Sequence, residues 1–181
     1  EGVVSTPASI ADRGEKAVRH YAGVSRVLVA DSVVPKGPRE GDIARYMPRE
    51  AHPHTKWRVF QTDGLQFLSP RAGSQLWWAC GAGKSPVGIV GAHQTDGLIV
   101  IVTKADARPH YRTQVRKFTT TIPYIHGRDA PETKAETIER YVERCRADGG
   151  RPLIVTGYEG LKGSIDRVRA LKPSVCVLDE V

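Results

Sequence analysis

The expected fold depends on three short apolar stretches of the sequence. Residues 98–103 read LIVIVT, residues 153–156 read LIVT and residues 175–179 read VCVLD. Such short runs, rich in β-branched residues, are typical of strands that are buried on both faces of a sheet. Residues 75–80 and 122–126 have the same character. We therefore expect a strand at each of these places.

The segments between these runs have the periodicity of amphipathic helices. Apolar residues recur every three or four positions, so that each segment has one apolar stripe. The stripes consist of Tyr111, Val115 and Phe118; of Ile138, Tyr141, Val142 and Cys145; and of Leu161, Ile165, Val168 and Leu171. Strands that alternate with helices predict right-handed crossovers and a doubly wound α/β fold, with a mostly parallel sheet flanked by helices. Ligands of such sheets bind at the carboxyl ends of the strands.

The first 55 residues differ from the rest of the chain. Residues 8–22 have a short helical pattern and residues 24–30 are rich in β-branched residues. Residues 35–41 read PKGPREG, which is rich in residues that break helices and strands. We expect an accessory segment and linker over residues 1–55 and one α/β domain over residues 56–181. Because the chain begins without methionine and ends directly after an apolar run, we expect it to be a piece of a longer parent chain.

The amino-acid composition indicates which kinds of partner the protein can have. The 181 residues include 27 lysines and arginines against 20 aspartates and glutamates, and the net charge of +7 favours a polyanionic partner such as nucleic acid. No stretch approaches the roughly 18 consecutive apolar residues of a membrane helix. The first residues carry charges where a signal peptide would be apolar. We expect a cytoplasmic protein with no membrane partner. The cysteines match no zinc-binding spacing.

A candidate phosphate-binding loop follows the strand expected at residues 75–80. Residues 80–85 read CGAGKS. Phosphate binding requires glycines that let backbone N–H groups approach the oxygens, a lysine for the β- and γ-phosphates, and a hydroxyl for the magnesium ion. The loop supplies these groups through Gly81, Ala82, Gly83, Lys84 and Ser85.

Two residues near the loop depart from the full phosphate-loop pattern. Trp78 stands where the pattern has its first glycine. Pro86 removes one N–H from the first turn of the following helix, although proline is also common early in a helix. An ordinary glycine turn between a strand and a helix is the alternative interpretation.

The last strand ends in an acidic pair, Asp179 and Glu180. Opposite a phosphate loop, Asp179 and Ser85 would hold Mg²⁺, and Glu180 would orient or deprotonate the attacking water. These two acids and Lys84 are the candidate catalytic residues. The alternative is an acidic pair at the start of an ordinary loop or helix.

Basic residues cluster after the strand that ends at Thr103. Lys104 follows directly, and Arg108, Arg112 and Arg116 recur every fourth residue, on one face of the predicted helix. The strand exit is the better candidate for contacts to a phosphate backbone. A solvated helix face is the alternative for the arginines.

Over residues 56–181 the order of these motifs resembles that of the amino-terminal RecA-like lobe of superfamily 2 helicases and translocases. The resemblance is greatest to the Swi/Snf-related group. Arg58, Phe60 and Gln61 precede the phosphate loop in the rhythm of that group. The resemblance implies that Arg58 and Gln61 contact ATP, with Gln61 reading the adenine.

The resemblance extends to two segments that face nucleic acid in that family. Thr103, Lys104 and Arg108 are similar to the family's motif Ia, where a strand exit and a helix start face the nucleic acid backbone. Gly157 and Tyr158 are similar to a later backbone-contacting segment. These five residues are the candidate nucleic-acid contacts.

The function implied by the resemblance is an ATP-dependent nucleic acid helicase or translocase that uses ATP and Mg²⁺ and acts on DNA rather than RNA. A second RecA-like lobe of the same parent chain would supply an arginine finger. Such a protein would be cytoplasmic, or would lie with DNA in the nucleoid or nucleus. A degenerate P-loop module that binds nucleic acid or a partner without hydrolysing ATP is the alternative, favoured by Trp78 and Pro86. A P-loop kinase of a small molecule is a third.

Overall fold

The computed structural model describes residues 26–29, 47–53, 55–68, 74–78, 81–128 and 130–179. The chain divides into two units, one formed by Glu1–Met47 and Thr55–Val87, and the other by Pro48–His54 and Gly88–Val181. Most of the accessory segment expected over residues 1–55 lies outside the described residues. Among the helices of the described residues, none is both long enough and apolar enough to cross a membrane.

The first unit contains a small parallel sheet. It is formed by β1 (Arg26–Val29) and β2 (Ser74–Trp77), and α2 (Val59–Leu68) precedes β2 in the chain. The strand expected at residues 75–80 is confirmed as far as Trp77. Residues 79 and 80, which end the expected strand, lie outside the described residues.

Trp78 is a core residue of the first unit. Its side chain is 7% exposed and meets the ring of Phe60 edge to face, with 5.0 Å between the ring centroids. A Cβ at Gly64 would lie 2.6 Å from the indole, so the close approach of α2 requires glycine there. The indole of Trp78 therefore packs the end of β2 against α2.

The second unit is built on a four-stranded sheet with the strand order β4-β5-β3-β6, in which every pair is parallel. The strands are β3 (Ile99–Thr103), β4 (Tyr124–His126), β5 (Leu153–Gly157) and β6 (Val175–Leu178). Ile101 is in register with Val155 on one side and with Val177 on the other. The predicted α/β fold with a parallel sheet flanked by helices is confirmed.

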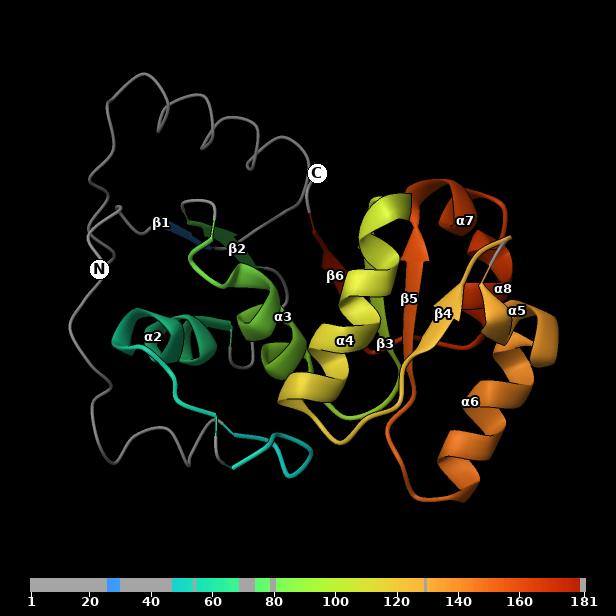
Figure 1. Ribbon diagram of the computed structural model, residues 1–181, viewed down its shortest axis with the longest axis horizontal. Helices are drawn as coiled ribbons and strands as arrows, with labels where there is room; N and C mark the ends of the chain where they lie inside the picture. The colour runs from blue at the N-terminus through green and yellow to red at the C-terminus, as the bar shows by residue number, and fades with distance from the viewer. Residues whose placement is uncertain are drawn as a thin grey trace. The chain divides into compact units, whose positions relative to one another are not determined.

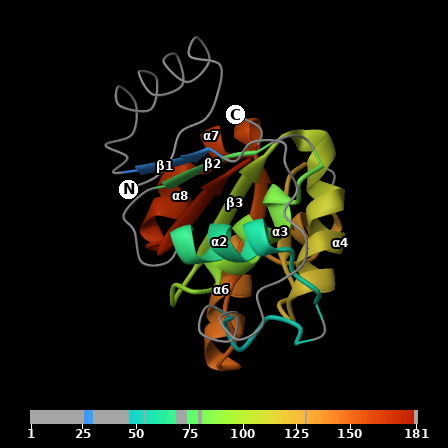
Figure 2. The same cartoon turned by 90° about the vertical axis from the view of Figure 1, so that its left-hand side faces the viewer.

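Helices cover both faces of this sheet, as Figures 1 and 2 show for α4 and α8. The helical elements of the chain after β2 are α3 (Lys84–Ala92), η2 (Ala105–Ala107), α4 (Arg108–Phe118), α5 (Pro131–Ala135), α6 (Ile138–Ala147), α7 (Tyr158–Lys162) and α8 (Ile165–Ala170). One core cluster joins α4 to alternate residues of β3 and β5, and a second joins α6 and α8 to the opposite face. Side chains alternate along a strand, so β3 and β5 are buried on both faces, as predicted.

The strands at the edges of the sheet differ from the prediction. In β6, half-buried and exposed residues alternate, and Leu178 is 57% exposed. The expectation of burial on both faces is wrong for β6, because Val175 and Val177 pack against a core cluster on one face, whereas Cys176 and Leu178 on the other face are exposed. At the other edge, β4 begins at Tyr124, and Ile122 is 67% exposed. Pro123 has no N–H to donate to a ladder, which explains the shorter strand.

The helix expected over residues 161–171 is interrupted. α7 ends at Lys162 and α8 begins at Ile165, with Gly163 and Ser164 between them. The Ser164 hydroxyl donates to the carbonyl of Gly160 at 2.7 Å. Glycine and serine favour such breaks, since glycine is conformationally free and serine offers the backbone a competing hydrogen bond. One predicted helix is therefore two short ones.

His93 is a buried titratable residue at the end of α3 in the second unit. It is 1% exposed, and its ring nitrogens bond to the Ile89 carbonyl at 2.7 Å and to the Thr121 hydroxyl at 2.9 Å. Burial is the largest cause that lowers the pKa of His93 below its ordinary value of about 6.5, and the charge of Arg151 acts in the same direction. The folded state therefore favours the neutral ring.

Acidification should destabilise the protein through His93. Below the unfolded pKa of about 6.5 the unfolded state binds more protons, so the free energy of unfolding should fall as the pH drops toward the lower folded pKa. The slope from this group is at most about 1.4 kcal/mol per pH unit. Urea denaturation at several pH values should show a flatter profile for His93→Gln, while His110→Gln, on an exposed position of α4, should keep the wild-type profile. Equal profiles for all three proteins would contradict the prediction.

Candidate functional site

The predicted phosphate loop has the conformation that its glycines allow. Gly81 has φ +78° and Gly83 has φ +86°, both in the left-handed region that favours glycine. The loop leads directly into α3, which begins at Lys84 and presents its first N–H groups there. Pro86 is the third residue of α3, where a missing N–H removes no intrahelical hydrogen bond. The loop thus consists of two glycines with positive φ directly before the start of a helix.

Lys84 is folded back onto this loop. Its Nζ donates to the Trp78 carbonyl at 2.9 Å, so the ammonium group lies between the end of β2 and the start of α3. Ser85 follows it in the first turn of α3 and is half-buried. The indole of Trp78 packs on α2. The carbonyl of Trp78 therefore accepts a hydrogen bond from Lys84, while its indole is part of the core of the first unit.

Gln61 joins α2 to the loop. Its Oε1 accepts the N–H of Arg58 at 3.0 Å, which satisfies an N–H at the start of the helix. Its Nε2 donates to the carbonyl of Ala82 at 3.2 Å, and a Cβ at Gly83 would clash with that nitrogen. The side chain of Gln61 therefore lies against the loop, while that of Arg58 is exposed. That Gln61 reads adenine stays a prediction.

In the second unit, the carboxyl ends of three neighbouring strands meet at one edge of the sheet. β5 ends at Gly157 in register with Thr103 of β3, and Asp179 follows β6, which pairs with the other side of β3. The Asp179 N–H donates to the Val102 carbonyl at 2.9 Å. The structure thus brings Asp179 together with Thr103 and Gly157. Glu180, the second residue of the acidic pair, lies outside the described residues.

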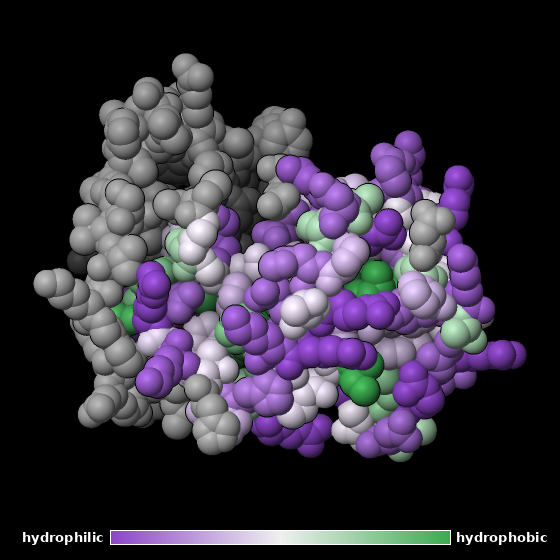
Figure 3. Space-filling view, in the orientation of Figure 1, coloured by the Kyte–Doolittle hydropathy of each residue, from purple (hydrophilic) through white to green (hydrophobic). Residues whose placement is uncertain are grey.

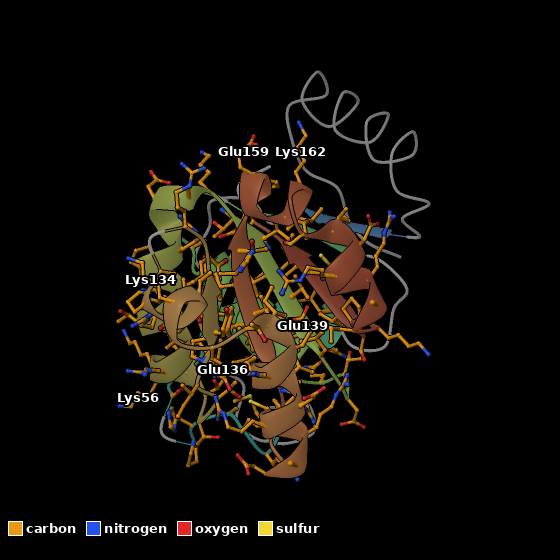
Figure 4. All side chains as sticks on the ribbon, turned by 90° about the vertical axis from the view of Figure 1, so that its right-hand side faces the viewer. Lys56, Lys134, Glu136, Glu139, Glu159 and Lys162 are labelled. Atoms are coloured by element: carbon orange, nitrogen blue, oxygen red, sulfur yellow. The ribbon has the colours of Figure 1, made fainter. Side chains whose placement is uncertain are left out.

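The candidate nucleic-acid residues at this edge differ in exposure. Thr103 is 0% exposed, and its buried hydroxyl has no hydrogen-bond partner among the described residues. Gly157 is buried as well, whereas Lys104 is exposed and Tyr158 is 37% exposed. Figure 4 shows Glu159 and Lys162 projecting from α7 at the same end of the unit. Lys104 and Tyr158 are the candidates whose side chains reach the surface.

The arginines of α4 do not form one free basic face. Arg108 donates from Nε to the Ala105 carbonyl at 2.9 Å and from Nη1 to the His126 carbonyl at 2.7 Å. Arg112 forms an ion pair with Glu132. Arg116 is exposed, on a helix whose visible surface is mainly hydrophilic in Figure 3. The Arg108 guanidinium thus holds together the exits of β3 and β4.

Tyr111 is a residue of this edge that the sequence analysis placed only in the apolar stripe of α4. Its hydroxyl donates to Oδ2 of Asp179 at 2.5 Å, across 68 residues of sequence. The periodicity of apolar residues in a helix predicts that the Tyr111 ring is buried. It does not predict which group the hydroxyl of that ring contacts. No local signal could have found this contact.

Among the described residues, no three His, Cys, Asp or Glu side chains lie close enough to hold a metal ion by themselves. Comparison with protein-family models, with curated proteins and with solved structures finds no match to this chain.

Proposed function

We propose that this chain is the ATP-binding, RecA-like lobe of a nucleic-acid-dependent ATPase of the helicase or translocase type. The observation that carries the proposal is the loop before α3, where two glycines with positive φ precede Lys84 at the start of a helix. This combination offers backbone N–H groups and a lysine to one anion. The net charge of +7 supports a polyanionic partner, for which we propose DNA.

The roles of the residues follow from the chemistry of nucleotide binding. The phosphates of ATP would be held by the loop residues Gly81, Ala82, Gly83, Lys84 and Ser85. Ser85 would contact Mg²⁺, and Gln61 and Arg58 would contact the base side of the nucleotide. The bound Mg²⁺ would neutralise phosphate charge and orient the terminal phosphate. Glu180 would orient water, and a second RecA-like lobe would supply an arginine.

A nucleic-acid-binding module that has lost ATP hydrolysis is the second candidate. Two observations favour it: Lys84 Nζ is bonded to the Trp78 carbonyl, and Pro86 removes an N–H from the first turn of α3. In this candidate the lysine would serve the loop itself, and the exposed residues at the carboxyl edge of the sheet would still bind nucleic acid.

Binding measurements on the 181-residue chain separate these functions. ATP with Mg²⁺ should be titrated by calorimetry, and mixed-sequence duplex DNA, single-stranded DNA and RNA by fluorescence anisotropy at a fixed salt concentration. A motor lobe should bind ATP and also DNA. Binding of DNA without ATP would establish the module instead, and binding of ATP without nucleic acid would favour a P-loop enzyme acting on a small molecule. Binding of neither would overturn the proposal.

Lys104→Glu should weaken DNA binding and reduce its salt dependence. Lys104 is exposed directly after β3, and each lost phosphate contact removes about one unit from the slope of log K against log salt. Lys117→Glu is the matched control, because Lys117 is exposed in the last turn of α4, away from the strand exit. The measurement is the DNA affinity between about 50 and 200 mM salt. Equal slopes for wild type and Lys104→Glu would place the DNA contact elsewhere.

A further inference from the structure

Gln61 connects two backbone segments of the first unit through both ends of its side-chain amide. Its Oε1 accepts the N–H of Arg58 at 3.0 Å, and its Nε2 donates to the carbonyl of Ala82 at 3.2 Å. Because one partner is an N–H and the other is a carbonyl, the two bonds fix which end of the amide carries the oxygen. The start of α2 is thus tied to the loop before α3.

The Ala82 carbonyl lies between Gly81 and Gly83, where the backbone has the most conformational freedom. A trans peptide unit is planar, so a carbonyl that is held on one side directs the N–H of the same unit to the other side. The bond from Gln61 therefore fixes the direction of the Gly83 N–H, which points away from the Gln61 amide. The Gly83 carbonyl accepts the N–H of Val87 in the first turn of α3. The peptide units on both sides of Gly83 are thus hydrogen-bonded.

Gln61 is supported on its own side, because its neighbour in α2 packs into the core of the unit. Phe60 meets the indole of Trp78 edge to face, with 5.0 Å between the ring centroids. The carbonyl of Trp78 accepts a hydrogen bond from Nζ of Lys84 at 2.9 Å. The loop is therefore bonded to the rest of the unit at two points, by Lys84 at its end and by Gln61 in its middle.

A loop that is ordered before its ligand arrives binds that ligand more tightly, because binding does not have to restrict the backbone again. This gain is largest where glycines would otherwise leave the backbone free. The Gln61 amide occupies the space that a Cβ at Gly83 would take, so the glycine and the glutamine fit together. The arrangement is suited to holding a glycine-containing loop in one conformation.

We propose that Gln61 is a positioning residue, whose side-chain amide orders the loop before α3 for the phosphates of a nucleotide. The inference rests on the proposed function, because it needs a phosphate group at this loop. The two hydrogen bonds use one of the two lone pairs of Oε1 and one of the two hydrogens of Nε2. The positioning role is therefore separate from the contact to the base and is additional to it.

The test uses inorganic tripolyphosphate, which has the phosphates of ATP without the base or the ribose. The affinities of the 181-residue chain for tripolyphosphate and for ATP are measured by calorimetry in EDTA, so that no metal ion contributes. Gln61→Met keeps the length of the side chain and removes its hydrogen bonds. It should weaken the binding of both ligands by a similar factor, about three- to tenfold, as expected for one lost hydrogen bond to the loop.

Gln66→Met is the matched control, because Gln66 is an exposed glutamine of the same helix. This variant should bind both ligands as the wild type does.

NMR relaxation of the chain without ligand gives a readout that a general structural role would not produce. In Gln61→Met the backbone order parameters of Ala82 and Gly83 should fall, while those of α2 keep their wild-type values. If α2 also loses order, or the variant does not fold, Gln61→Glu decides by the same measurement. Its carboxylate still accepts the N–H of Arg58 and cannot donate to Ala82. Wild-type order parameters for the loop of Gln61→Glu would overturn the positioning role.

The two ligands separate the failure of this inference from the failure of the proposed function. If Gln61→Met weakens the binding of ATP alone, Gln61 contacts only the base, so the positioning role is overturned and the phosphate loop stands. Unchanged affinity for both ligands would overturn the positioning role as well. Lys84→Ala should weaken the binding of tripolyphosphate, which places the anion at the loop. If Lys84→Ala binds it with wild-type affinity, or the wild-type chain binds neither ligand, the proposed function falls and the inference falls with it.

Discussion

Lys84→Ala should weaken ATP binding by the chain about 10- to 100-fold. The estimate follows from about 1.5 to 3 kcal/mol for a hydrogen bond to a charged group, at about 1.4 kcal/mol for each factor of ten. Lys84 begins α3 directly after the loop glycines, where its ammonium group can meet a phosphate. If the protein hydrolyses ATP, the same change should abolish turnover. The measurement is calorimetric titration with ATP and Mg²⁺.

Lys56→Ala is the control for the loss of charge. Lys56 is an exposed lysine of the same unit and lies outside the loop, so the variant should bind ATP as the wild type does. The fold of the Lys84→Ala chain should be retained, because Lys84 is only half-buried and donates one bond to the Trp78 carbonyl. If Lys84→Ala binds ATP with wild-type affinity, the loop is an ordinary turn between strand and helix.

Ile101→Ala should lower the free energy of unfolding by about 4 kcal/mol, within the range of 2 to 5 kcal/mol for large-to-small changes in a well-packed core. Ile101 is 0% exposed in the middle of β3, with β5 on one side and β6 on the other. The core cluster on its face includes Tyr111 and Val155, which cannot close the cavity without distorting α4 or β5. Urea denaturation followed by circular dichroism gives the loss.

Ile122→Ala makes the same chemical change at an exposed position. Ile122 is 67% exposed beyond the end of β4, so its loss should change the stability by no more than about 0.5 kcal/mol. The contrast between the two isoleucines tests the burial of the middle of β3 directly. Similar losses for the two variants would show that the burial assigned to Ile101 is wrong.

The pattern of apolar residues was sufficient to predict the class of fold. β3 and β5 are short runs of mainly apolar residues, because a strand that is buried on both faces requires apolar side chains on both. α4 and α6 follow the predicted stripes because burying one face of a helix requires that period. The positive φ values of Gly81 and Gly83 were not predicted, although they lie in the region that favours glycine.

Other features could not be predicted from local patterns. β6 has the same apolar character as β3, yet it is an edge strand and exposes Leu178. Trp78 interrupts the phosphate-loop pattern in the sequence, yet its indole is a core group against α2. Arg108 belongs to a regular row of arginines, yet it bonds to the backbone of two strand exits. In each case the neighbours of the residue come from elsewhere in the chain.

The sequence by itself determined the α/β class and the approximate places of the strands in the sheet, because these depend on the periodicity of apolar residues. The tertiary structure decided which strands are inner or outer and which polar atoms meet, as in the pairing of Tyr111 with Asp179 across 68 residues. The physical reason is that strand order and register are selected by the packing of the whole sheet, so a contact between distant residues has no signature in either segment alone.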